Sequence, residues 1–368
     1  MRVTLVIYSL GSGGAERIIS IMANYWAHEG WEVTILTLEN GKEPPFFQLH
    51  PQVMHSSLGL AAKSSGKLNG LQNNITRAIG LRKAIIASKP QVVISFMDMT
   101  NIITLLATIG LRLPVIVTEH NDPYQRKISA FWSTLRQLAY IRASKLIVLH
   151  KTALNYFLPS IRKRGQVLFN PVVLPMEGDE ETGPSRDEHS KVVIAMGRLV
   201  EQKGFDMLLH AFAKIAAKHP DWSLEVWGDG PLRGNLEKLR DQLGIEKNVN
   251  FPGKTKSPLQ KMKQADLFVL SSRYEGFPTV LCEAMACGLP VVSFDCPTGP
   301  DEIIRDGTDG ILVPPGNIDA LANAMDLLMS DEKHRCRISS HAPEVLERFG
   351  LKKTMDIWND LLTQAKIQ

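Results

Sequence analysis

The strongest constraint on the fold is a strand–helix alternation that runs twice along the chain. The segments of the first half that we expect to form strands are 2–9, 32–38, 92–96, 115–119 and 145–149. Most of them are continuous apolar runs, which are typical of strands buried on both faces of a parallel sheet. Stretches with helical spacing of apolar residues lie between them, at 16–29, 76–87 and 101–109. This alternation predicts an α/β fold with a doubly wound parallel sheet.

The alternation restarts after residues 170–190, which are rich in Pro, Gly, Asp and Glu and show no periodicity. We interpret that segment as an interdomain linker. The strand-like segments of the second half are 192–196, 223–227, 249–251, 267–270, 290–293 and 310–313. A chain of 368 residues has room for two domains of roughly 150 residues each. We therefore predict two doubly wound domains, 1–170 and 171–349, with a ligand cleft between them.

Charge is divided unevenly between the two halves. Residues 1–170 contain 19 Lys or Arg and 8 Asp or Glu, whereas the remainder contains 23 basic and 30 acidic residues. The first domain would therefore attract an anionic partner. Nucleic acid, anionic lipid and a diphosphate substrate are all compatible with this excess.

The sequence lacks the motifs that mark several classes of protein. No run of 18 uncharged apolar residues predicts a membrane-spanning helix, and the N-terminus has the pattern of a strand rather than a signal peptide. The four cysteines have no paired C-x-x-C spacing, which is typical of reduced thiols in a cytosolic protein. The sequence also has no P-loop, no G-x-S-x-G, no zinc-ligand spacing and no Asp-x-Asp pair. We therefore expect no cofactor and no metal.

Two loops that follow strands are candidates for binding an anion. Gly13 and Gly14 lie between the first strand and the first helix, where glycine lets the backbone approach a ligand and the helix N-terminus offers N–H donors. Glu16 stands where a dinucleotide fingerprint needs glycine, which argues against an NAD enzyme. In the second half, Arg198 and Lys203 follow a strand and could clamp a diphosphate. The alternatives are a tight turn in the first case and solvated loop cations in the second.

Three further side chains could face the predicted cleft. Glu275 and Glu283 bracket a Gly-Phe-Pro sequence, and carboxylates accept hydrogen bonds from sugar or ribose hydroxyls. Two carboxylates at this spacing also occur by chance. His120 ends an apolar strand and would point into the cleft, although a hydrogen-bonded structural histidine is the alternative.

Residues 123–142 mix cations with large apolar residues in a helical pattern. The cations are Arg126, Lys127, Arg136 and Arg142. A basic amphipathic helix of this kind can lie on anionic lipid or hold a lipid diphosphate. The alternative is an ordinary helix packed on its own domain.

Taken together, these motifs resemble the retaining, nucleotide-sugar-dependent glycosyltransferases of family 4, which have the GT-B fold of two facing Rossmann-like domains. The resemblance runs through the whole chain and is most specific over 194–316, from the Gly-Arg-Leu…Lys-Gly loop to the Pro-Pro-Gly segment. The opening at 13–17 fits the same family. The segments 95–101 and 119–121 are similar to bacterial enzymes that extend polyprenyl-diphosphate-linked glycans or exopolysaccharides, although Thr118 replaces their more usual Ser.

The resemblance implies a role for each candidate residue. Arg198 and Lys203 would bind the donor diphosphate and stabilise the departing nucleotide, and Glu283 would hold the ribose. The donor sugar would contact Glu275 and the backbone of Gly276, Phe277 and Pro278. His120 would reach the transferred sugar from the first domain, and Gly13 and Gly14 would approach the diphosphate. The base would rest against 251–255, which includes Gly253, and a final helix at 350–368 would pack back on the first domain.

The resemblance also implies the activity. The chain would move a hexose or N-acetylhexosamine from a nucleotide sugar, with UDP as the family expectation, to a polyprenyl-diphosphate-linked saccharide. It would be cytoplasmic, with peripheral attachment to the inner face of the cytoplasmic membrane and no nucleic acid partner. The alternatives are a nucleotide-sugar epimerase of the same fold, a lipopolysaccharide-core glycosyltransferase, and a non-catalytic protein that uses only its basic domain.

Overall fold

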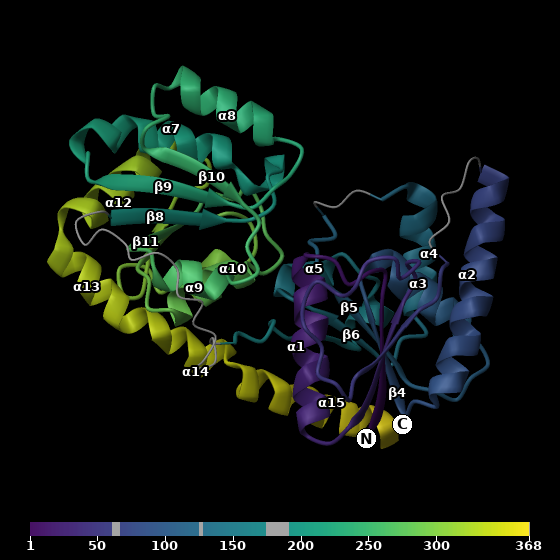
Figure 1. The fold of residues 1–368 in the computed structure, drawn as a ribbon. Helices are drawn as coiled ribbons and strands as arrows, with labels where there is room; N and C mark the ends of the chain where they lie inside the picture. Colours follow the sequence, from purple (N-terminus) through teal and green to yellow (C-terminus); the bar gives the residue numbers. More distant parts are fainter. Residues whose placement is uncertain (61–66, 125–127, 174–190, 368) are drawn as a thin grey trace. The chain divides into compact units, whose positions relative to one another are not determined.

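In the computed structural model, the chain forms two compact units, which are drawn in Figure 1. Unit 1 contains residues 1–171 and 352–368, and unit 2 contains residues 172–351. The structure describes residues 1–60, 67–124, 128–173 and 191–367. The division between the units falls next to the boundary expected at residue 170.

Unit 1 is built on a seven-stranded parallel sheet with the order β3-β2-β1-β4-β5-β6-β7. Its strands are β1 (Arg2–Ile7), β2 (Glu32–Thr37), β3 (Met54–Ser57), β4 (Val92–Phe96), β5 (Val115–Glu119), β6 (Lys145–Val148) and β7 (Gly165–Val167). Its helices are α1 (Gly14–His28), α2 (Lys67–Ser88), α3 (Asp98–Ala107), α4 (Ala130–Tyr140), α5 (Lys151–Asn155), α6 (Pro159–Arg162) and α15 (Leu351–Ile367). The central strands are buried along nearly their whole length, as their apolar runs predict.

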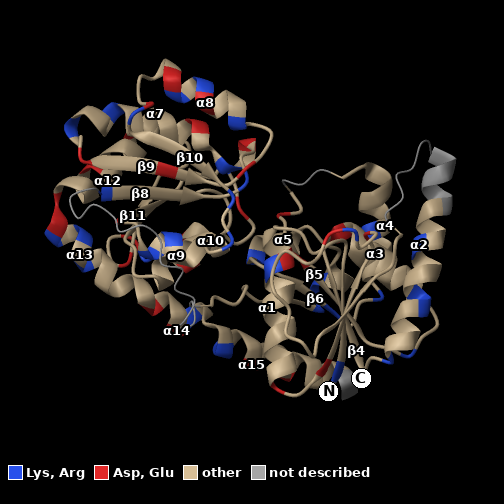
Figure 2. Cartoon of the chain, in the orientation of Figure 1, with Lys and Arg blue, Asp and Glu red and all other residues tan. Residues whose placement is uncertain are grey.

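Unit 2 repeats the arrangement on a six-stranded parallel sheet with the order β10-β9-β8-β11-β12-β13. Its strands are β8 (Lys191–Met196), β9 (Trp222–Trp227), β10 (Val249–Gly253), β11 (Leu267–Leu270), β12 (Val291–Phe294) and β13 (Ile311–Val313). Its helices are α7 (Phe205–Ile215), α8 (Arg233–Gln242), α9 (Pro258–Lys263), α10 (Thr279–Ala286), α11 (Pro300–Ile303), α12 (Ile318–Ser330), α13 (Glu332–His341) and α14 (Val345–Phe349). The core lies between the sheet and α7 and α12, around Phe212, Leu224 and Met325. In Figure 2 the charged residues of this unit gather on helices such as α8 and α13, whereas its strands are mostly uncharged.

In both sheets the strand order reverses beside the first strand of the unit. The reversal lies between β1 and β4 in unit 1 and between β8 and β11 in unit 2. In open parallel sheets, ligands bind outside the carboxyl ends of the strands at such a reversal. The loops that follow β8 and β11 are therefore the places where a ligand of unit 2 is expected.

Helix α15 is the last element of the sequence, yet it packs on unit 1. Its buried side chains include Met355, Trp358 and Leu362. The Trp26 indole nitrogen of α1 donates a hydrogen bond to the Asn359 amide oxygen at 2.8 Å. The Trp26 and Trp358 rings meet edge to face, with centroids 6.4 Å apart. The core of unit 1 is therefore completed by the end of the chain.

Three local predictions differ from the structure. The short edge strands β3 and β7 were not expected, because their residues are polar or only partly buried and make no apolar run. The helical pattern of residues 333–345 predicts one helix, but the structure divides this stretch into α13, a 3₁₀ turn over Ala342–Glu344 and α14. Pro343 lies in that turn and lacks the N–H that a continuous helix needs.

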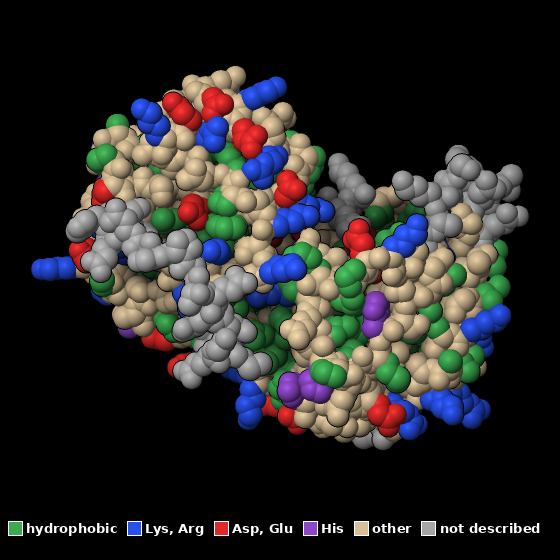
Figure 3. Space-filling model, viewed as in Figure 1, with side chains coloured by type: hydrophobic (Ala, Val, Ile, Leu, Met, Phe, Trp, Pro, Cys, Tyr) green, Lys and Arg blue, Asp and Glu red, His purple; other side chains and the backbone are tan. Residues whose placement is uncertain are grey.

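On the face seen in Figure 3, charged side chains are dispersed over both units, as is ordinary for a globular surface.

Candidate functional site

Two loops of unit 2 are joined to each other at the reversal of its sheet. Residues 197–204 follow β8, and residues 271–278 follow β11. The Ser271 hydroxyl donates to the Lys203 carbonyl at 2.9 Å, and the Gln202 amide donates to the Tyr274 carbonyl at 3.0 Å. The Arg273 backbone N–H donates to the Gln202 carbonyl at 2.8 Å. These bonds fix the side chains that the two loops carry relative to one another.

The central feature of this pair of loops is an ion pair between Lys203 and Glu275. Lys203 Nζ lies 2.6 Å from Glu275 Oε1, and the two side chains are 18% and 6% exposed. The Ser272 hydroxyl donates to the same carboxylate oxygen at 2.5 Å. The Thr298 hydroxyl donates to the Glu275 carbonyl. A cation and a carboxylate therefore lie together at the edge of the sheet where the carboxyl ends of its strands meet, called the carboxyl edge below. Both groups are partly desolvated and hydrogen-bonded.

Gly204 explains how the first loop approaches the second. Its φ of +60° lies in the left-handed region, and a Cβ there would lie 2.1 Å from the Ser271 carbonyl oxygen. Only glycine fits such a position without displacing the backbone. The glycine therefore allows Lys203 to reach Glu275.

The other predicted donor-site residues lie around the same edge of the sheet. Arg198 is exposed on the loop after β8. Phe277 and Pro278 are buried, Gly276 is partly exposed, and Glu283 is buried on α10. Gly253 ends β10, and its carbonyl accepts a hydrogen bond from the Gly228 N–H at 2.8 Å. The structure thus places all of these residues in unit 2, with Lys203 and Glu275 in direct contact.

In unit 1 the predicted glycine loop opens helix α1. Gly13 is the N-cap residue of α1, and Gly14 is exposed. A Cβ on Gly13 would lie 2.2 Å from Oε2 of Glu16, so the Glu16 carboxylate lies directly over this glycine. The same loop therefore presents both a helix N-terminus and a carboxylate.

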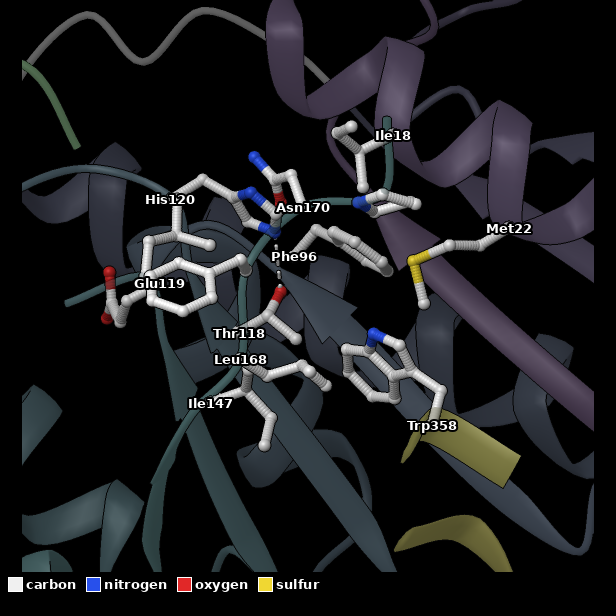
Figure 4. A pocket seen from close by; sticks show the side chains of 13 residues that line it. Ile18, Met22, Phe96, Thr118, Glu119, His120, Ile147, Leu168, Asn170 and Trp358 are labelled. Carbon is white, nitrogen blue, oxygen red and sulfur yellow. Dashed lines mark hydrogen bonds between the residues drawn. The ribbon is translucent and has the colours of Figure 1, made fainter. Parts of the chain in front are cut away.

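His120 follows β5 and lines a small pocket within unit 1, shown in Figure 4. Its ring stacks on Phe96, with centroids 5.3 Å apart. Its Nε2 lies 3.1 Å from the Thr118 hydroxyl, which itself donates to the Ser95 carbonyl. Because Thr118 has a single proton to donate, His120 Nε2 carries a proton and Nδ1 is left as an acceptor. Nδ1 is buried and has no hydrogen-bond partner among the residues that the structure describes.

Burial lowers the pKa of His120 from 6.5 to about 4. The imidazole is therefore neutral at physiological pH. Ile18 and Met22 of α1 and Trp358 of α15 form the apolar part of the same pocket (Figure 4). This surrounding is what disfavours the charged ring.

The expectation that Arg136 contacts a lipid surface is wrong. The side chain is 1% exposed, and its guanidinium lies 4.5 Å from the centroid of the Tyr156 ring. Its Nη1 lies 3.8 Å from Oε1 of Glu119. Arg136 thus belongs to the interior face of α4. Arg142 is exposed, and Arg126 and Lys127 lie outside the residues that the structure describes.

A buried polar network surrounds Glu119, the residue before His120. The Tyr140 hydroxyl donates to Oε1 of Glu119, and the Asn101 amide donates to the Tyr140 hydroxyl at 2.9 Å. The same amide donates to the Thr118 carbonyl at 2.9 Å. Burial, followed by the Glu119 carboxylate, raises the pKa of Tyr140 well above its usual range. The phenol therefore remains a donor and holds the end of β5 in place.

Known proteins match both units of the chain. Residues 179–345 match the model of the group 1 glycosyl transferases, and residues 13–172 match the glycosyl transferase 4-like domain. A relative from Campylobacter jejuni is named GalNAc-α-(1→4)-GalNAc-α-(1→3)-diNAcBac-PP-undecaprenol α-1,4-N-acetyl-D-galactosaminyltransferase. It is 31% identical over 368 residues, which cover 100% of this chain and 99% of the relative. The chain belongs to the group 1 glycosyltransferases.

Other comparisons agree with this assignment. The amylovoran biosynthesis glycosyltransferase AmsD of Erwinia amylovora is 26% identical over 95% of this chain and 96% of its own length. The crystal structure of HepE from Anabaena with UDP and glucose superposes with a TM-score of 0.81 at 21% identity, covering 99% of this chain and 100% of that one. Sucrose-phosphate synthase from Thermosynechococcus elongatus gives 0.83 at 19% identity and covers 98% of each chain. These structures show that the fold of this glycosyltransferase is GT-B, as predicted.

Several residues that support this glycosyltransferase site were assigned no role from the sequence. Ser272 and Thr298 hold Glu275, and Asn101 and Tyr140 hold the end of β5. Ser272 precedes Glu275 by three residues and could have been found as a local donor to it. Tyr140 and Trp358 carry no local signal, because their partners are distant in the sequence.

Proposed function

We propose that this glycosyltransferase moves a hexose or N-acetylhexosamine from a UDP-sugar to a polyprenyl-diphosphate-linked saccharide, with retention at the anomeric carbon. The observation that carries the donor assignment is the Lys203–Glu275 pair at the carboxyl edge of unit 2. A cation at this place suits a diphosphate, and a carboxylate beside it suits sugar hydroxyls. The reversal of strand order at the same place supports a ligand there.

The chemistry follows from the charges that develop. The bond between the anomeric carbon and the diphosphate oxygen breaks, and the nucleoside diphosphate leaves with additional negative charge. The exposed Arg198 and the pre-positioned Lys203 stabilise that charge without a metal. The acceptor hydroxyl attacks the same face of the sugar, and a donor phosphate oxygen takes its proton. Glu275 and the backbone of 276–278 bind the sugar, and Glu283 binds the ribose.

His120 contributes a neutral acceptor in this proposal. Nδ1 has a lone pair and no partner in the described structure, so it accepts a hydrogen bond from a hydroxyl of the transferred sugar. Gly13 and Gly14 contribute backbone N–H groups near the diphosphate. The neutral ring adds no positive charge, which leaves charge stabilisation to Arg198 and Lys203.

The acceptor and the location are supported by the relatives and by charge. The Campylobacter jejuni relative carries undecaprenol in its name, as does a second enzyme from that species that is 25% identical over 90% of this chain. The excess of Lys and Arg in residues 1–170 suits an anionic lipid acceptor. We propose attachment to the inner face of the cytoplasmic membrane as a peripheral protein. No helix in the described part of the chain is long and apolar enough to cross a bilayer.

The experiment that tests the donor assignment is thermal unfolding with UDP, GDP, ADP and NAD⁺ in turn, in EDTA and in Mg²⁺. A nucleotide at 100 times its Kd stabilises the protein by about 2.7 kcal/mol. We expect a shift with UDP that does not depend on Mg²⁺ and that is lost in Arg198→Ala. No shift with any nucleoside diphosphate would contradict the proposal.

The transfer itself is then assayed with UDP-sugars and an undecaprenyl-diphosphate disaccharide. UDP release that depends on the lipid acceptor, together with an α-linked product from an α-linked donor, is the expected result. Transfer to a lipopolysaccharide core instead would replace the proposed acceptor. Interconversion of the free UDP-sugar without transfer would contradict the acceptor role altogether.

A further inference from the structure

We propose that Phe349 is a positioning residue for the donor sugar. Phe349 is the last residue of α14, and its ring contacts Phe277 in the loop that follows β11. In the proposed function the backbone of 276–278 binds the sugar, and this inference rests on that assignment. Phe349 acts through Phe277: it fixes the loop and touches neither the sugar nor the nucleotide.

The contact between the two rings is buried and has a defined geometry. The ring centroids lie 5.5 Å apart, and the ring planes are inclined by 67°. Phe277 is 6% exposed and Phe349 is 4% exposed. Aromatic pairs prefer such an edge-to-face arrangement, which needs both rings. The position of the Phe277 side chain therefore depends on the ring of Phe349.

A cation next to Phe349 helps to hold its ring. Arg348 Cζ lies 5.3 Å from the centroid of the Phe349 ring. Arg348 Nη2 lies 3.1 Å from Oδ2 of Asp309, and Arg305 Nε lies 2.7 Å from the same oxygen. Asp309 is fully buried, so this carboxylate is a fixed partner for the guanidinium. The attraction between Arg348 and the ring is thus anchored in the interior of unit 2.

The backbone of Phe349 is held where the chain passes between the two units. The chain enters unit 2 at Val172 and leaves it after Leu351. The Val172 N–H donates to the Phe349 carbonyl at 2.9 Å, and Val172 forms an isolated parallel bridge with Gly350. The beginning and the end of unit 2 are therefore joined to each other at Phe349.

A second contact restrains the sugar-binding loop through its backbone. Gly299 has a φ of +114°, and a Cβ there would lie 2.7 Å from Cδ of Pro278. The Gly299 backbone therefore lies directly against Pro278. The loop is restrained at Pro278 by this backbone approach and at Phe277 by Phe349. Only the contact with Phe349 can be removed by shortening a side chain.

The charged part of the donor site is held by other contacts. Lys203 and Ser272 both bond to the carboxylate of Glu275, within the two loops that follow β8 and β11. Glu283, the proposed ribose ligand, lies on α10, which packs against α14. Loss of the Phe349 ring should therefore weaken sugar binding selectively, whereas a general loosening of α14 would weaken UDP binding as well.

The test is isothermal titration calorimetry of the full chain in EDTA. The probes are UDP and four sugar nucleotides: UDP-glucose, UDP-galactose, UDP-N-acetylglucosamine and UDP-N-acetylgalactosamine. The variants are Phe349→Leu, Phe277→Leu and the double variant. The control is Phe212→Leu, the same change at a fully buried ring in the core of unit 2. Thermal unfolding shows that each variant is folded.

We expect Phe349→Leu to raise the Kd of the sugar nucleotide that the unmodified chain binds most tightly by about fivefold or more, because the aromatic pair is lost. The Kd of UDP should stay within about twofold. The double variant should be no weaker than the weaker single variant, since the second substitution removes a contact that is already lost. Phe212→Leu should leave both constants unchanged.

Three results would overturn the proposal. The first is an unchanged Kd of the sugar nucleotide in Phe349→Leu. The second is an equal rise in the Kd of UDP, which would assign Phe349 to the general stability of α14. The third is a double variant in which the two losses multiply, which would show that the two rings act independently. An unmodified chain that does not bind UDP would instead contradict the donor assignment itself, so the two failures are distinguishable.

Discussion

Replacing Lys203 by methionine separates the structural role of its ion pair from a role in catalysis. The substitution keeps the length of the side chain but removes the charge that contacts Glu275 at 2.6 Å. Breaking a fully buried pair costs about 3–5 kcal/mol. Lys203 is 18% exposed, and Ser272 still donates to Glu275, so we expect a smaller loss in the free energy of unfolding, about 2 kcal/mol.

The effect on turnover should be larger than this loss of stability implies. Removing one pre-positioned charge-stabilising group typically costs about 3 kcal/mol of transition-state stabilisation, roughly a hundredfold in rate. The assay is the initial rate of nucleoside diphosphate release at saturating donor, with urea unfolding measured in parallel. Lys214→Met is the matched control, because Lys214 pairs with Asp319 at 2.7 Å but the two side chains are 53% and 76% exposed. That exposed pair should contribute less than about 1 kcal/mol, and its loss should leave turnover unchanged.

A double variant, Lys203→Met/Glu275→Gln, decides between the two roles. It removes both charges, so the free energy of unfolding should return to within about 1 kcal/mol of the unmodified chain. Turnover should remain reduced at least as much as in Lys203→Met. If turnover is unchanged in Lys203→Met, or recovers together with stability in the double variant, Lys203 serves the fold and not the departing diphosphate.

Four other predictions, at three residues, follow from contacts within each unit. NMR titration of the His120 imidazole should show no protonation between pH 8 and 5.5, because burial holds its pKa at about 4; a midpoint near 6.5 would contradict the buried tautomer. Because the pKa of His120 in the folded chain lies below its unfolded value, its contribution to stability is complete above pH 6.5 and is lost as the pH falls toward 4, by about 3 kcal/mol in all. Urea unfolding of the unmodified chain and of His120→Asn, each at pH 6.5 and at pH 4, would measure this loss. Gly204→Ala should lower the free energy of unfolding by roughly 2–4 kcal/mol, because its Cβ would lie 2.1 Å from a backbone oxygen. The control Gly288→Ala, where φ is +80° and the space around a Cβ is open, should lower it by only about 1 kcal/mol. Equal losses in the two variants would refute the close approach at Gly204. Tyr140→Phe should cost about 1–3 kcal/mol, because the buried Glu119 loses a donor, and Tyr124→Phe at an exposed site should cost almost nothing in the same unfolding assay.

The sequence predicts the sheets of this protein better than it predicts the contacts between loops. Apolar runs identify the central strands, because a strand covered on both faces excludes polar residues. Edge strands such as β3 escape this argument, since their residues are half exposed. The two candidate donor loops could be found because each follows an apolar strand.

The contact between the loops 197–204 and 271–278 cannot be predicted from the spacing of residues in the sequence. Lys203 and Glu275 are 72 residues apart, and their contact depends on β8 and β11 being neighbours in the sheet. For Arg136 the sequence led to a wrong prediction of exposure, because a cation in a helical pattern is ordinarily solvated. Its place in the interior depends on Tyr156, an aromatic residue on another segment. The face of α4 that meets solvent therefore became evident only from the tertiary structure.

The position of helix α15 also affects the order in which the protein can mature during synthesis. Unit 2 is continuous in the sequence, whereas unit 1 needs residues from both sides of it. A ribosome-bound chain that ends at residue 351 holds every residue of unit 2 but lacks Trp358 and Asn359, the partners of Trp26. Domains usually fold in order from the N-terminus as they emerge. Unit 1 therefore cannot reach its final packing until residues beyond unit 2 have been made, and the pocket beside His120 gains its last wall only when translation has passed Trp358.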